Sequence, residues 1–401
     1  MREAEMAIPH LFRCPISLDL FTDPVTLCTG QTYDRSSIEK WLSAGNLTCP
    51  VTMQKLPDPS MVPNHTLRHL INQWLQFDNN VDPDCFKMID PDHSLVALKH
   101  NLESHESTFE TKLQTLEKIQ VLSAELPMKN TVLIELGFFP LLLELALRSV
   151  EGTNFQDHLK FVEQALICAL KLLPFSDLGS LNLLKEGAKL AYFLVLFEQG
   201  TSIIQKSLCH LVGSTSSSME TKDLCAMLGK TRALSRGMIH LLHENSEASE
   251  AAIKAISALC SLESNRVNMV REGAVRGLIT YISNAERCER SLAPMAMATV
   301  ELLLGLESGK EALINQPNGV NVLVKMVFRV SDHEGSESAV NSLMIICFDS
   351  LQATEKAICA GVLTQLLLLL QSQCSGRTKT KARMLLKLLR SMWADDPKNT
   401  L

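Results

Sequence analysis

Hydrophobic and polar residues follow two different patterns along the 401-residue chain. Up to about residue 76, short alternating stretches lie between turn residues. Residues 22–27 alternate and predict a β-strand. Ser36 and Glu39, three residues apart, predict a capping box at the start of a helix over 37–42, and Gly45 is expected to end it. The first part of the chain is therefore expected to be a small domain of short strands and helices.

A second helix is predicted over 66–75, and a composition break follows it. The helix would place four apolar residues on one face: Leu67, Leu70, Ile71 and Trp74. Residues 78–94 then combine aspartate, asparagine and proline with few apolar side chains. We therefore predict a linker, which we assign to 79–105.

From about residue 108 onward the pattern repeats at intervals of 36 to 50 residues, each marked by a glycine expected to break a helix. These glycines are Gly137, Gly187, Gly237, Gly273, Gly319 and Gly361. Most are followed by an apolar helix, a polar loop and a longer helix. The longer helices are predicted at 159–173, 203–212, 250–262, 293–306, 338–351 and 381–392. Such periods are typical of an armadillo or HEAT superhelix with an extended groove. Helices at 108–126 and 381–392 are expected to cap its two ends.

Composition narrows the class of protein. Aromatic residues make up only 5% of the chain and the net charge is −6, so nothing indicates a nucleic-acid partner. The amino terminus lacks an apolar signal sequence, and no apolar run reaches the roughly 18 residues of a membrane span. The twelve cysteines contain no C-x-x-C pair, as expected of reduced thiols. We expect a soluble, mostly α-helical protein in the cytoplasm, with the nucleus as an alternative.

The region between Cys14 and Thr52 has the spacing of a zinc site without its ligands. Cys14, Cys28 and Cys49 each stand where a ligand pair would begin, but the second ligand of each pair is missing. A tetrahedral zinc site needs four such ligands, so we expect no metal. We hypothesise that hydrogen bonds and ion pairs replace it. The candidate residues are Ser17, Asp19, Asp23, Asp34, Arg35, Ser36, Glu39 and Thr52.

These motifs resemble a U-box, the zinc-free relative of the RING domain. The residues that carry the resemblance lie at 8–20, 23–25, 29–35, 38–42, 48–52 and 62–64. With helical repeats behind it, the whole chain resembles the plant U-box/armadillo-repeat ubiquitin-protein ligases. The resemblance implies a U-box at 5–78, the linker at 79–105, and an armadillo superhelix of about six repeats plus capping helices at 106–395.

The resemblance also implies a shallow apolar groove for a ubiquitin-conjugating enzyme, formed by Ile16, Leu18, Trp41 and Pro50. An exposed apolar patch around a tryptophan is typical of a binding hot spot, although these residues could simply be core. Met53 departs from the family. Many of its members have a basic residue there, which donates hydrogen bonds to ubiquitin and folds the thioester-linked enzyme and ubiquitin into their reactive form. A thioether donates no hydrogen bond, so either Gln54 or Lys55 substitutes for it, or the ligase is weaker or more selective in its conjugating enzyme.

The expected function is that of a ubiquitin ligase that brings two partners together. The U-box would bind the ubiquitin-charged conjugating enzyme and the repeats a protein substrate, with no cofactor and no covalent nucleophile on this chain. A homodimer is possible, and the resemblance suggests plant stress or defence signalling. The rival hypothesis is a non-catalytic armadillo adaptor with a weakened U-box. A nuclear-import groove is disfavoured because Trp393 is the single tryptophan after the U-box.

Two further features have alternative interpretations. His65 and His69 could ligate a metal, but they lack a cysteine pair and are expected to be ordinary helical residues. A basic run near the carboxyl terminus could bind acidic lipid or protein, or could be the solvated face of the last helix. Its members are Arg377, Lys379, Lys381, Arg383, Lys387 and Arg390.

Overall fold

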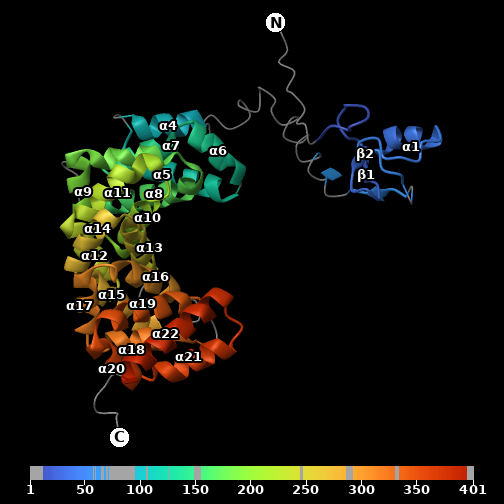
Figure 1. The fold of residues 1–401 in the computed structure, drawn as a ribbon. Helices are drawn as coiled ribbons and strands as arrows, with labels where there is room; N and C mark the ends of the chain where they lie inside the picture. Colours follow the sequence, from blue (N-terminus) through green and yellow to red (C-terminus); the bar gives the residue numbers. More distant parts are fainter. Residues whose placement is uncertain are drawn as a thin grey trace. The chain divides into compact units, whose positions relative to one another are not determined.

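The computed structural model describes most of the chain, as two units. Its described residues are 12–56, 58, 60–64, 67–68, 71, 95–104, 107–125, 127–148, 155–243, 247–285, 292–329 and 334–394. Contacts divide the chain between Ala97 and Leu98 into an N-terminal unit and a helical unit (Figure 1). His65 and His69 lie outside the described residues.

The N-terminal unit is built on a three-stranded antiparallel sheet in the order β2-β1-β3. Its strands are β1 (Pro24–Thr26), β2 (Thr32–Asp34) and β3 (Val62–Pro63). Val25 in the central strand lies opposite Tyr33 on one side and Pro63 on the other. The strand predicted at 22–27 is therefore confirmed, in a shorter form.

Helix α1 (Arg35–Ser43) follows β2 directly, and its start differs from the prediction. Asp34, not Ser36, is the N-cap residue, and its side chain makes no capping bond to the helix. The predicted capping box is thus wrong, because the Asp34 carboxylate is bound to the preceding loop and the Ser36 hydroxyl donates to it. Gly45 follows the helix with φ of +85°, a left-handed conformation that glycine adopts without strain.

An apolar cluster forms the core of the described part of the N-terminal unit. Its buried members come from both loops, the sheet and α1: Cys14, Phe21, Val25, Leu27, Tyr33, Ile38, Cys49, Leu56 and Ile71. Leu67 also packs against this cluster, and it is helical like Arg68 and Ile71. These are the described residues of the helix predicted at 66–75.

In the described residues, the helical unit begins with five helices and continues as groups of three or four helical elements. The first four are α4 (Leu95–Glu103), α5 (Phe109–Glu125), α6 (Pro127–Glu135) and α7 (Phe138–Ala146). Helix α4 lies inside the segment 79–105 that we predicted as a linker, so the end of that segment is helical. The first longer helix, α8 (Phe155–Leu172), follows α7.

Two groups then use 3₁₀ turns beside α-helices. The first comprises η3 (Leu173–Phe175), η4 (Leu178–Lys185), α9 (Gly187–Gln199) and α10 (Ser202–Ser214). The second comprises η5 (Met219–Thr221), α11 (Lys222–Lys230), α12 (Arg232–Leu241) and α13 (Glu247–Ser261).

Three further groups are wholly α-helical. They are α14 (Glu263–Arg271), α15 (Ala274–Asn284) and α16 (Ala293–Leu303); α17 (Glu307–Ile314), α18 (Gly319–Val327) and α19 (Ser336–Asp349); and α20 (Leu351–Cys359), α21 (Val362–Gln371) and α22 (Gly376–Ala394). The longer helices predicted from the sequence correspond to α8, α10, α13, α16, α19 and α22.

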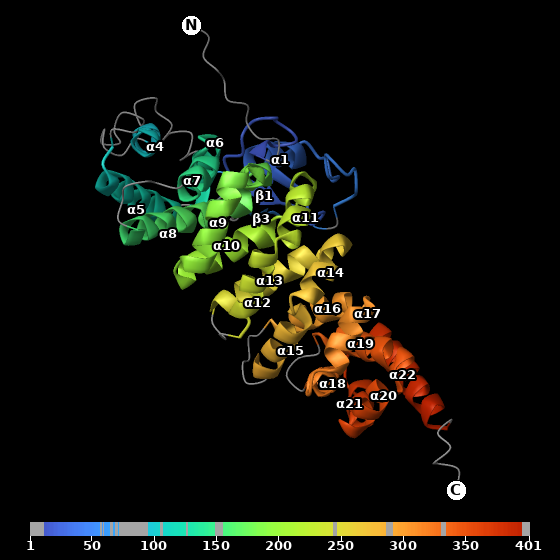
Figure 2. The same ribbon diagram turned by 90° about the vertical axis from the view of Figure 1, so that its left-hand side faces the viewer.

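The longer helices stack on one another in chain order, and we call α5, α8, α10, α13, α16, α19 and α22 the inner helices. Each contacts the next, and Figures 1 and 2 show them following one another through the unit, with the shorter helices outside them. Buried residues such as Leu208, Ile256 and Val300 fill the space between neighbouring inner helices. The predicted superhelix of stacked repeats is confirmed.

Five of the six marker glycines lie at helix starts, and one does not. Gly137, Gly273 and Gly361 have positive φ just before α7, α15 and α21, while Gly187 and Gly319 are the first residues of α9 and α18. Gly237 lies inside α12, so its predicted helix-breaking role is wrong. A Cβ there would lie 2.7 Å from the Phe197 ring, so the position requires glycine for packing.

Within the described residues, no single helix is long and apolar enough to span a membrane. Helices α20 and α21, which meet at 69°, pass the length and composition test only as a bent pair.

Candidate functional site

The N-terminal unit contains two loops of the same geometry, 35 residues apart in sequence. In the first loop, Cys14 N–H donates to the Asp19 carbonyl at 2.8 Å and Leu18 N–H to the Cys14 carbonyl at 2.8 Å. In the second, Cys49 N–H donates to the Gln54 carbonyl at 2.8 Å and Met53 N–H to the Cys49 carbonyl at 2.9 Å. We call 12–21 and 47–56 the twin loops.

Each twin loop ends its turn with an exposed apolar residue in a left-handed conformation. Leu18 has φ of +63° and is 67% exposed, and Met53 has φ of +59° and is 72% exposed. Residues with a Cβ seldom adopt this conformation, so the loop hydrogen bonds must hold it. Both turns thus present a large apolar side chain to solvent at the expense of local backbone strain.

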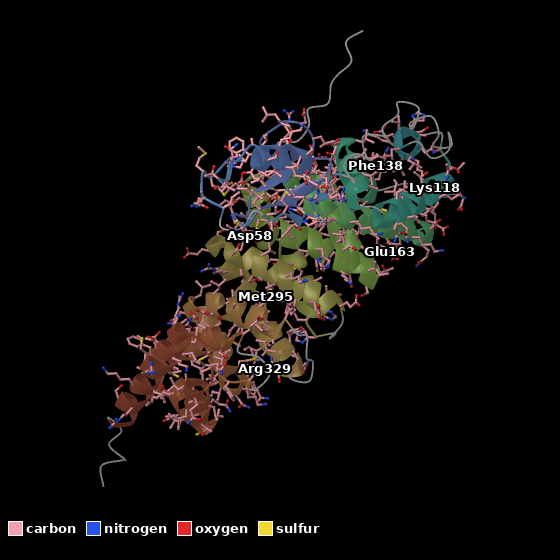
Figure 3. All side chains as sticks on the ribbon, turned by 90° about the vertical axis from the view of Figure 1, so that its right-hand side faces the viewer. Asp58, Lys118, Phe138, Glu163, Met295 and Arg329 are labelled. Carbon is pink, nitrogen blue, oxygen red and sulfur yellow. The ribbon has the colours of Figure 1, made fainter. Side chains whose placement is uncertain are left out.

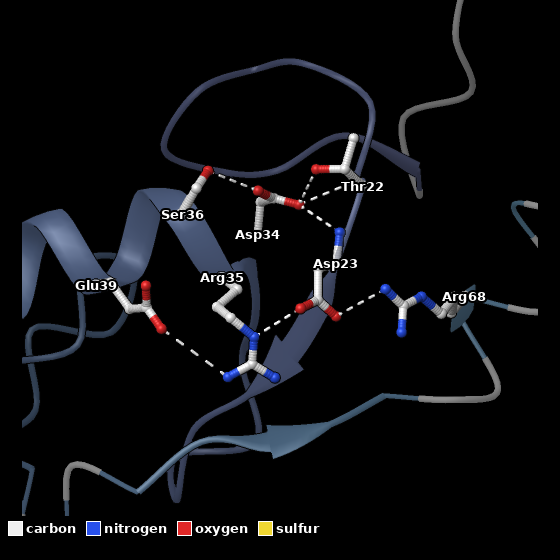
Figure 4. A network of polar contacts seen from close by, with 7 residues as sticks. All are labelled: Thr22, Asp23, Asp34, Arg35, Ser36, Glu39 and Arg68. Carbon is white, nitrogen blue, oxygen red and sulfur yellow. Dashed lines mark hydrogen bonds and ion pairs between the residues drawn. The ribbon is translucent and has the colours of Figure 1, made fainter.

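Polar contacts join Thr22 and Asp23, which directly follow the first twin loop, to the sheet and α1 (Figure 4). The Asp34 carboxylate accepts hydrogen bonds from Thr22 N–H at 2.8 Å, the Thr22 hydroxyl at 2.9 Å, Asp23 N–H at 2.8 Å and the Ser36 hydroxyl at 2.8 Å. Burial alone would raise the pKa of Asp34, but these hydrogen bonds outweigh it and lower the pKa.

An ion-pair chain continues this network through α1. Arg35 Nε lies 2.6 Å from the Asp23 carboxylate, and Arg68 reaches the other Asp23 oxygen at 3.3 Å. Arg35 also pairs with Glu39 at 4.0 Å. Of the other residues suggested for this network, Ser17 accepts a bond from Asp19 N–H, and the hydroxyls of Ser17 and Thr52 help to lower the pKa values of Cys14 and Cys49.

Hydrogen bonds also hold the two buried thiols of the twin loops. The Cys49 sulfur contacts the Tyr33 hydroxyl at 3.0 Å and accepts from Thr29 at 3.4 Å, while Cys14 accepts from Asp34 N–H at 3.3 Å. Burial opposes thiolate formation, but hydrogen bonding outweighs it and lowers the pKa of Cys49 to about 6. These donors satisfy sulfurs that would be metal ligands in a RING domain. Among the described residues, no three His, Cys, Asp or Glu side chains form a group that could hold a metal.

The predicted groove residues lie on or beside the twin loops. Trp41 Nε1 donates to the Thr48 carbonyl at 2.9 Å, which ties α1 to the second loop. Ile16 and Trp41 are half-buried and pack against the same core cluster. Pro50 is also half-buried, whereas Leu18 projects into solvent. The alternative that all four are core is therefore wrong for Leu18.

The structure adds Val51, which our sequence reasoning missed. Val51 is the counterpart of Ile16 in the second loop and is 51% exposed. The repeated pattern Cys-Pro-apolar-hydroxyl-apolar at 14–18 and 49–53 could have revealed it. We call Ile16, Leu18, Trp41, Pro50, Val51 and Met53 together the twin-loop surface.

The inner helices of the helical unit carry a second candidate surface. Large apolar side chains are exposed on five of them: Val121, Ile203, Met295, Leu302, Phe348 and Met384. Figure 3 labels Met295 on α16 and Glu163 on α8, both inner helices. Near Ile203 a cavity of about 520 Å³ opens between α8 and α10, lined by Ile167, Leu170 and Lys206 among others. Exposed apolar groups beside a cavity are suited to binding a protein segment.

Comparison with known families assigns both units. Residues 8–80 match the U-box domain, and residues 95–398 match the plant U-box protein ARM repeat region. The chain belongs to the plant U-box proteins with an ARM repeat region. This family resemblance was predicted from the sequence and is confirmed.

Relatives match almost the whole chain. U-box domain-containing protein 26 of Arabidopsis thaliana is 32% identical over 97% of this chain and 93% of its own length. E3 ubiquitin-protein ligase PUB23 of the same plant is 28% identical over 98% of this chain and 96% of its own length. Among solved structures, UNC-45 from Drosophila melanogaster has 16% identity and a TM-score of 0.57, covering 92% of this chain and 49% of that one, which supports the fold alone. Ubiquitin ligase activity is thus the activity of this chain's family.

Proposed function

We propose that the twin-loop surface binds a ubiquitin-conjugating enzyme that carries ubiquitin. The main support is that two loops with the same backbone geometry expose Leu18, Val51 and Met53 beside Trp41. Hydrogen-bonded loops hold these side chains before any partner arrives, which reduces the entropic cost of binding. A partner that buries them would gain the energy of an apolar hot spot.

The proposed transfer needs no covalent intermediate on this chain. Binding of the charged enzyme and the substrate to one chain raises the effective concentration of the attacking lysine at the thioester. The buried thiols of the helical unit are unsuited to carrying ubiquitin themselves, because burial raises the pKa of Cys168, Cys209 and Cys260 to about 12.

Met53 cannot donate a hydrogen bond to ubiquitin. The reactive arrangement of the thioester-linked enzyme and ubiquitin must therefore be stabilised by another group, or be stabilised less. Gln54 and Lys55 follow directly and are both exposed. Their side chains are free for a partner, because in this loop the residues pair through the backbone, Gln54 with Cys49 and Lys55 with Thr48. We assign the hydrogen-bond donor to Lys55 or Gln54.

The substrate would bind along the inner helices. Ile203, Met295, Leu302 and Phe348 are apolar side chains exposed on these helices, and the cavity beside Ile203 offers a site for a substrate side chain. Of the terminal basic run, Arg377 and Lys381 already pair with Glu337 at 3.0 and 2.7 Å, which favours a structural role for those two.

A reconstituted self-ubiquitination assay with a panel of conjugating enzymes tests this function. The informative variant is Leu18→Asn, because asparagine tolerates the left-handed conformation and removes the exposed apolar group. We expect the rate to fall at least about tenfold, the size of a hot-spot loss. Val62→Asn is the matched control, since Val62 is also exposed but lies on β3, and it should retain activity.

Two results would contradict the proposal in different ways. A wild-type ladder that Leu18→Asn leaves unchanged would show that the enzyme binds elsewhere. The absence of a ladder with every conjugating enzyme would favour the adaptor hypothesis, with Met53 as the first residue to examine. Circular dichroism of both variants distinguishes loss of binding from loss of folding.

A further inference from the structure

Three arginines converge on one nearly buried carboxylate, away from the inner helices. The Glu272 side chain is 6% exposed and lies 3.2 Å from Arg232 Nε, 3.1 Å from Arg236 Nη2 and 3.6 Å from Arg271 Nε. All three arginine side chains are more than half exposed. Each guanidinium uses one nitrogen toward Glu272, so most of its N–H groups remain available to a ligand.

Local structure explains the convergence. Arg232 and Arg236 are four residues apart and share one face of α12. Arg271 ends α14, and Glu272 is the C-cap residue before the left-handed Gly273. The turn at Gly273 leads into α15, whose first turn carries Arg276. Figure 1 shows α12, α14 and α15 in the outer layer, separate from the proposed substrate surface on the inner helices.

The arginines outnumber their acidic partners. Within the described part of the chain, Glu272 is the one carboxylate that pairs with Arg232, Arg236 or Arg271, and Arg271 also donates to the Asn268 side chain. This leaves an excess of two positive charges at the cluster, on a chain whose net charge is −6. The excess is therefore local and suited to attracting an anion.

A cavity with several polar side chains in its lining lies at Arg276, four residues after Glu272. It measures about 470 Å³ and is lined by Arg276, Thr280, Asn315, Gln316, Pro317 and Asn318. The Gln316 side-chain oxygen is buried without a hydrogen-bond partner. Amide and hydroxyl side chains of this kind can pair with the N–H and C=O groups of a peptide backbone.

We propose that Arg232, Arg236 and Arg271 bind the phosphate of a phosphorylated protein segment, whose flanking residues enter the cavity at Arg276. Planar guanidinium forks match the oxygens of a phosphoryl group and bind it through charge-assisted hydrogen bonds. A phosphate carries nearly two charges and three strong acceptor oxygens, so it gains more than a carboxylate does from the positive charge that Glu272 leaves uncompensated. Glu272 holds the arginines in place for this ligand.

The cavity is what favours a peptide over a membrane surface. A membrane-binding face combines basic residues with apolar side chains that insert between lipids. Here the cavity at Arg276 offers the side chains of Asn315, Gln316 and Asn318, which can pair with a peptide backbone. This surface is independent of the ligase activity, so it is testable by binding alone.

Fluorescence polarisation of the full chain with labelled peptide pools provides the test. The pools carry phosphoserine, glutamate or serine at a fixed position among random residues. We expect the phosphoserine pool to bind at least about tenfold more tightly than the other two, as charge-assisted pairs to two arginines imply. The double variant Arg232→Gln with Arg236→Gln should lose this preference.

The matched control is Arg383→Gln with Arg390→Gln, which removes two exposed arginines from α22 and should bind as the wild type does. Arg232→Lys with Arg236→Lys keeps the charge and should bind phosphoserine more weakly while folding normally. Equal binding of the serine pool, or an equal loss in the α22 control, would overturn the proposal. So would preferential binding to phosphatidylcholine vesicles containing phosphatidic acid over the phosphoserine pool.

Discussion

The two units are stabilised in different ways. The N-terminal unit has one small apolar cluster and depends on polar contacts at Asp34, Asp23 and Cys49 to hold its loops. The helical unit buries apolar side chains continuously between its inner helices. A domain of about 70 residues buries a smaller fraction of its surface and is only marginally stable, whereas stacked repeats extend their core with each helix. Polar substitutions should therefore matter most in the first unit, and cavities most in the second.

The largest expected effect is a cavity in the helical unit. Ile256 on α13 is fully buried, and α13 packs against both α10 and α16. Ile256→Ala should cost about 2–5 kcal/mol of stability, the range for buried isoleucine or leucine truncated to alanine. Hydrogen exchange should show lost protection around α13 and unchanged protection at 12–56. A loss spread equally over both units would refute the separation of their stabilities.

A somewhat smaller effect is expected at the polar centre of the N-terminal unit. Asp34→Asn removes a charged acceptor of four hydrogen bonds and should destabilise that unit by about 2–4 kcal/mol at pH 7. Chemical denaturation followed by the signal of the N-terminal unit measures this, with Asp58→Asn as an exposed control. Unchanged stability would mean that the apolar cluster alone holds the loops.

The wild type and Asp34→Asn also test how the stability of the N-terminal unit depends on pH. The folded-state pKa of Asp34 lies below its ordinary value of 3.8. Its contribution is therefore fully present above pH 3.8 and is lost as the pH falls through the folded-state pKa. The stability difference between wild type and Asp34→Asn should stay constant from pH 5 to 8 and shrink below about pH 4.

The smallest of these effects concerns a helix contact in the second unit. Gly237→Ala would place a Cβ 2.7 Å from the Phe197 ring and should cost about 1–3 kcal/mol, a typical overpacking penalty. Gly187→Ala is the matched control, because nothing lies within 4 Å of its added Cβ. That variant should be stabilised by up to about 1 kcal/mol through the unfolded state. Thermal unfolding should shift in opposite directions for the two variants.

Long periodic helices were the elements that sequence reasoning located well. Apolar spacing predicted α8, α10, α13, α16, α19 and α22, because the inner helices bury a continuous face. The short outer helices α11, α14, α17 and α20 were not predicted individually. Helix α14 shows why: its nine residues, Glu263–Arg271, include mostly polar side chains, and two of its buried residues are asparagines. Asn265 is held by backbone carbonyls of Cys225 and Leu259, contacts that no local pattern reveals.

In the candidate site, the sequence located the two loops but did not show which of their side chains are exposed. The lost zinc ligands and the family motifs located Ile16, Leu18, Trp41 and Pro50. Which of them is exposed depends on the loop backbone, and the left-handed turns at Leu18 and Met53 decide it. The same turns bring Val51 to the surface. Left-handed leucine and methionine are too rare for a sequence to predict.

The sequence by itself determined the two-part organisation, the helical repeats and the absence of paired zinc ligands, because periodicity and ligand spacing are local properties. Only the tertiary structure decided that the Asp34 carboxylate accepts hydrogen bonds from the preceding loop rather than capping α1, and that Gly237 leaves space for the Phe197 ring. It also decided that three arginines from two helices gather around Glu272. These outcomes depend on which distant residues compete for the same donor, acceptor or space, and that competition arises only when the chain is folded.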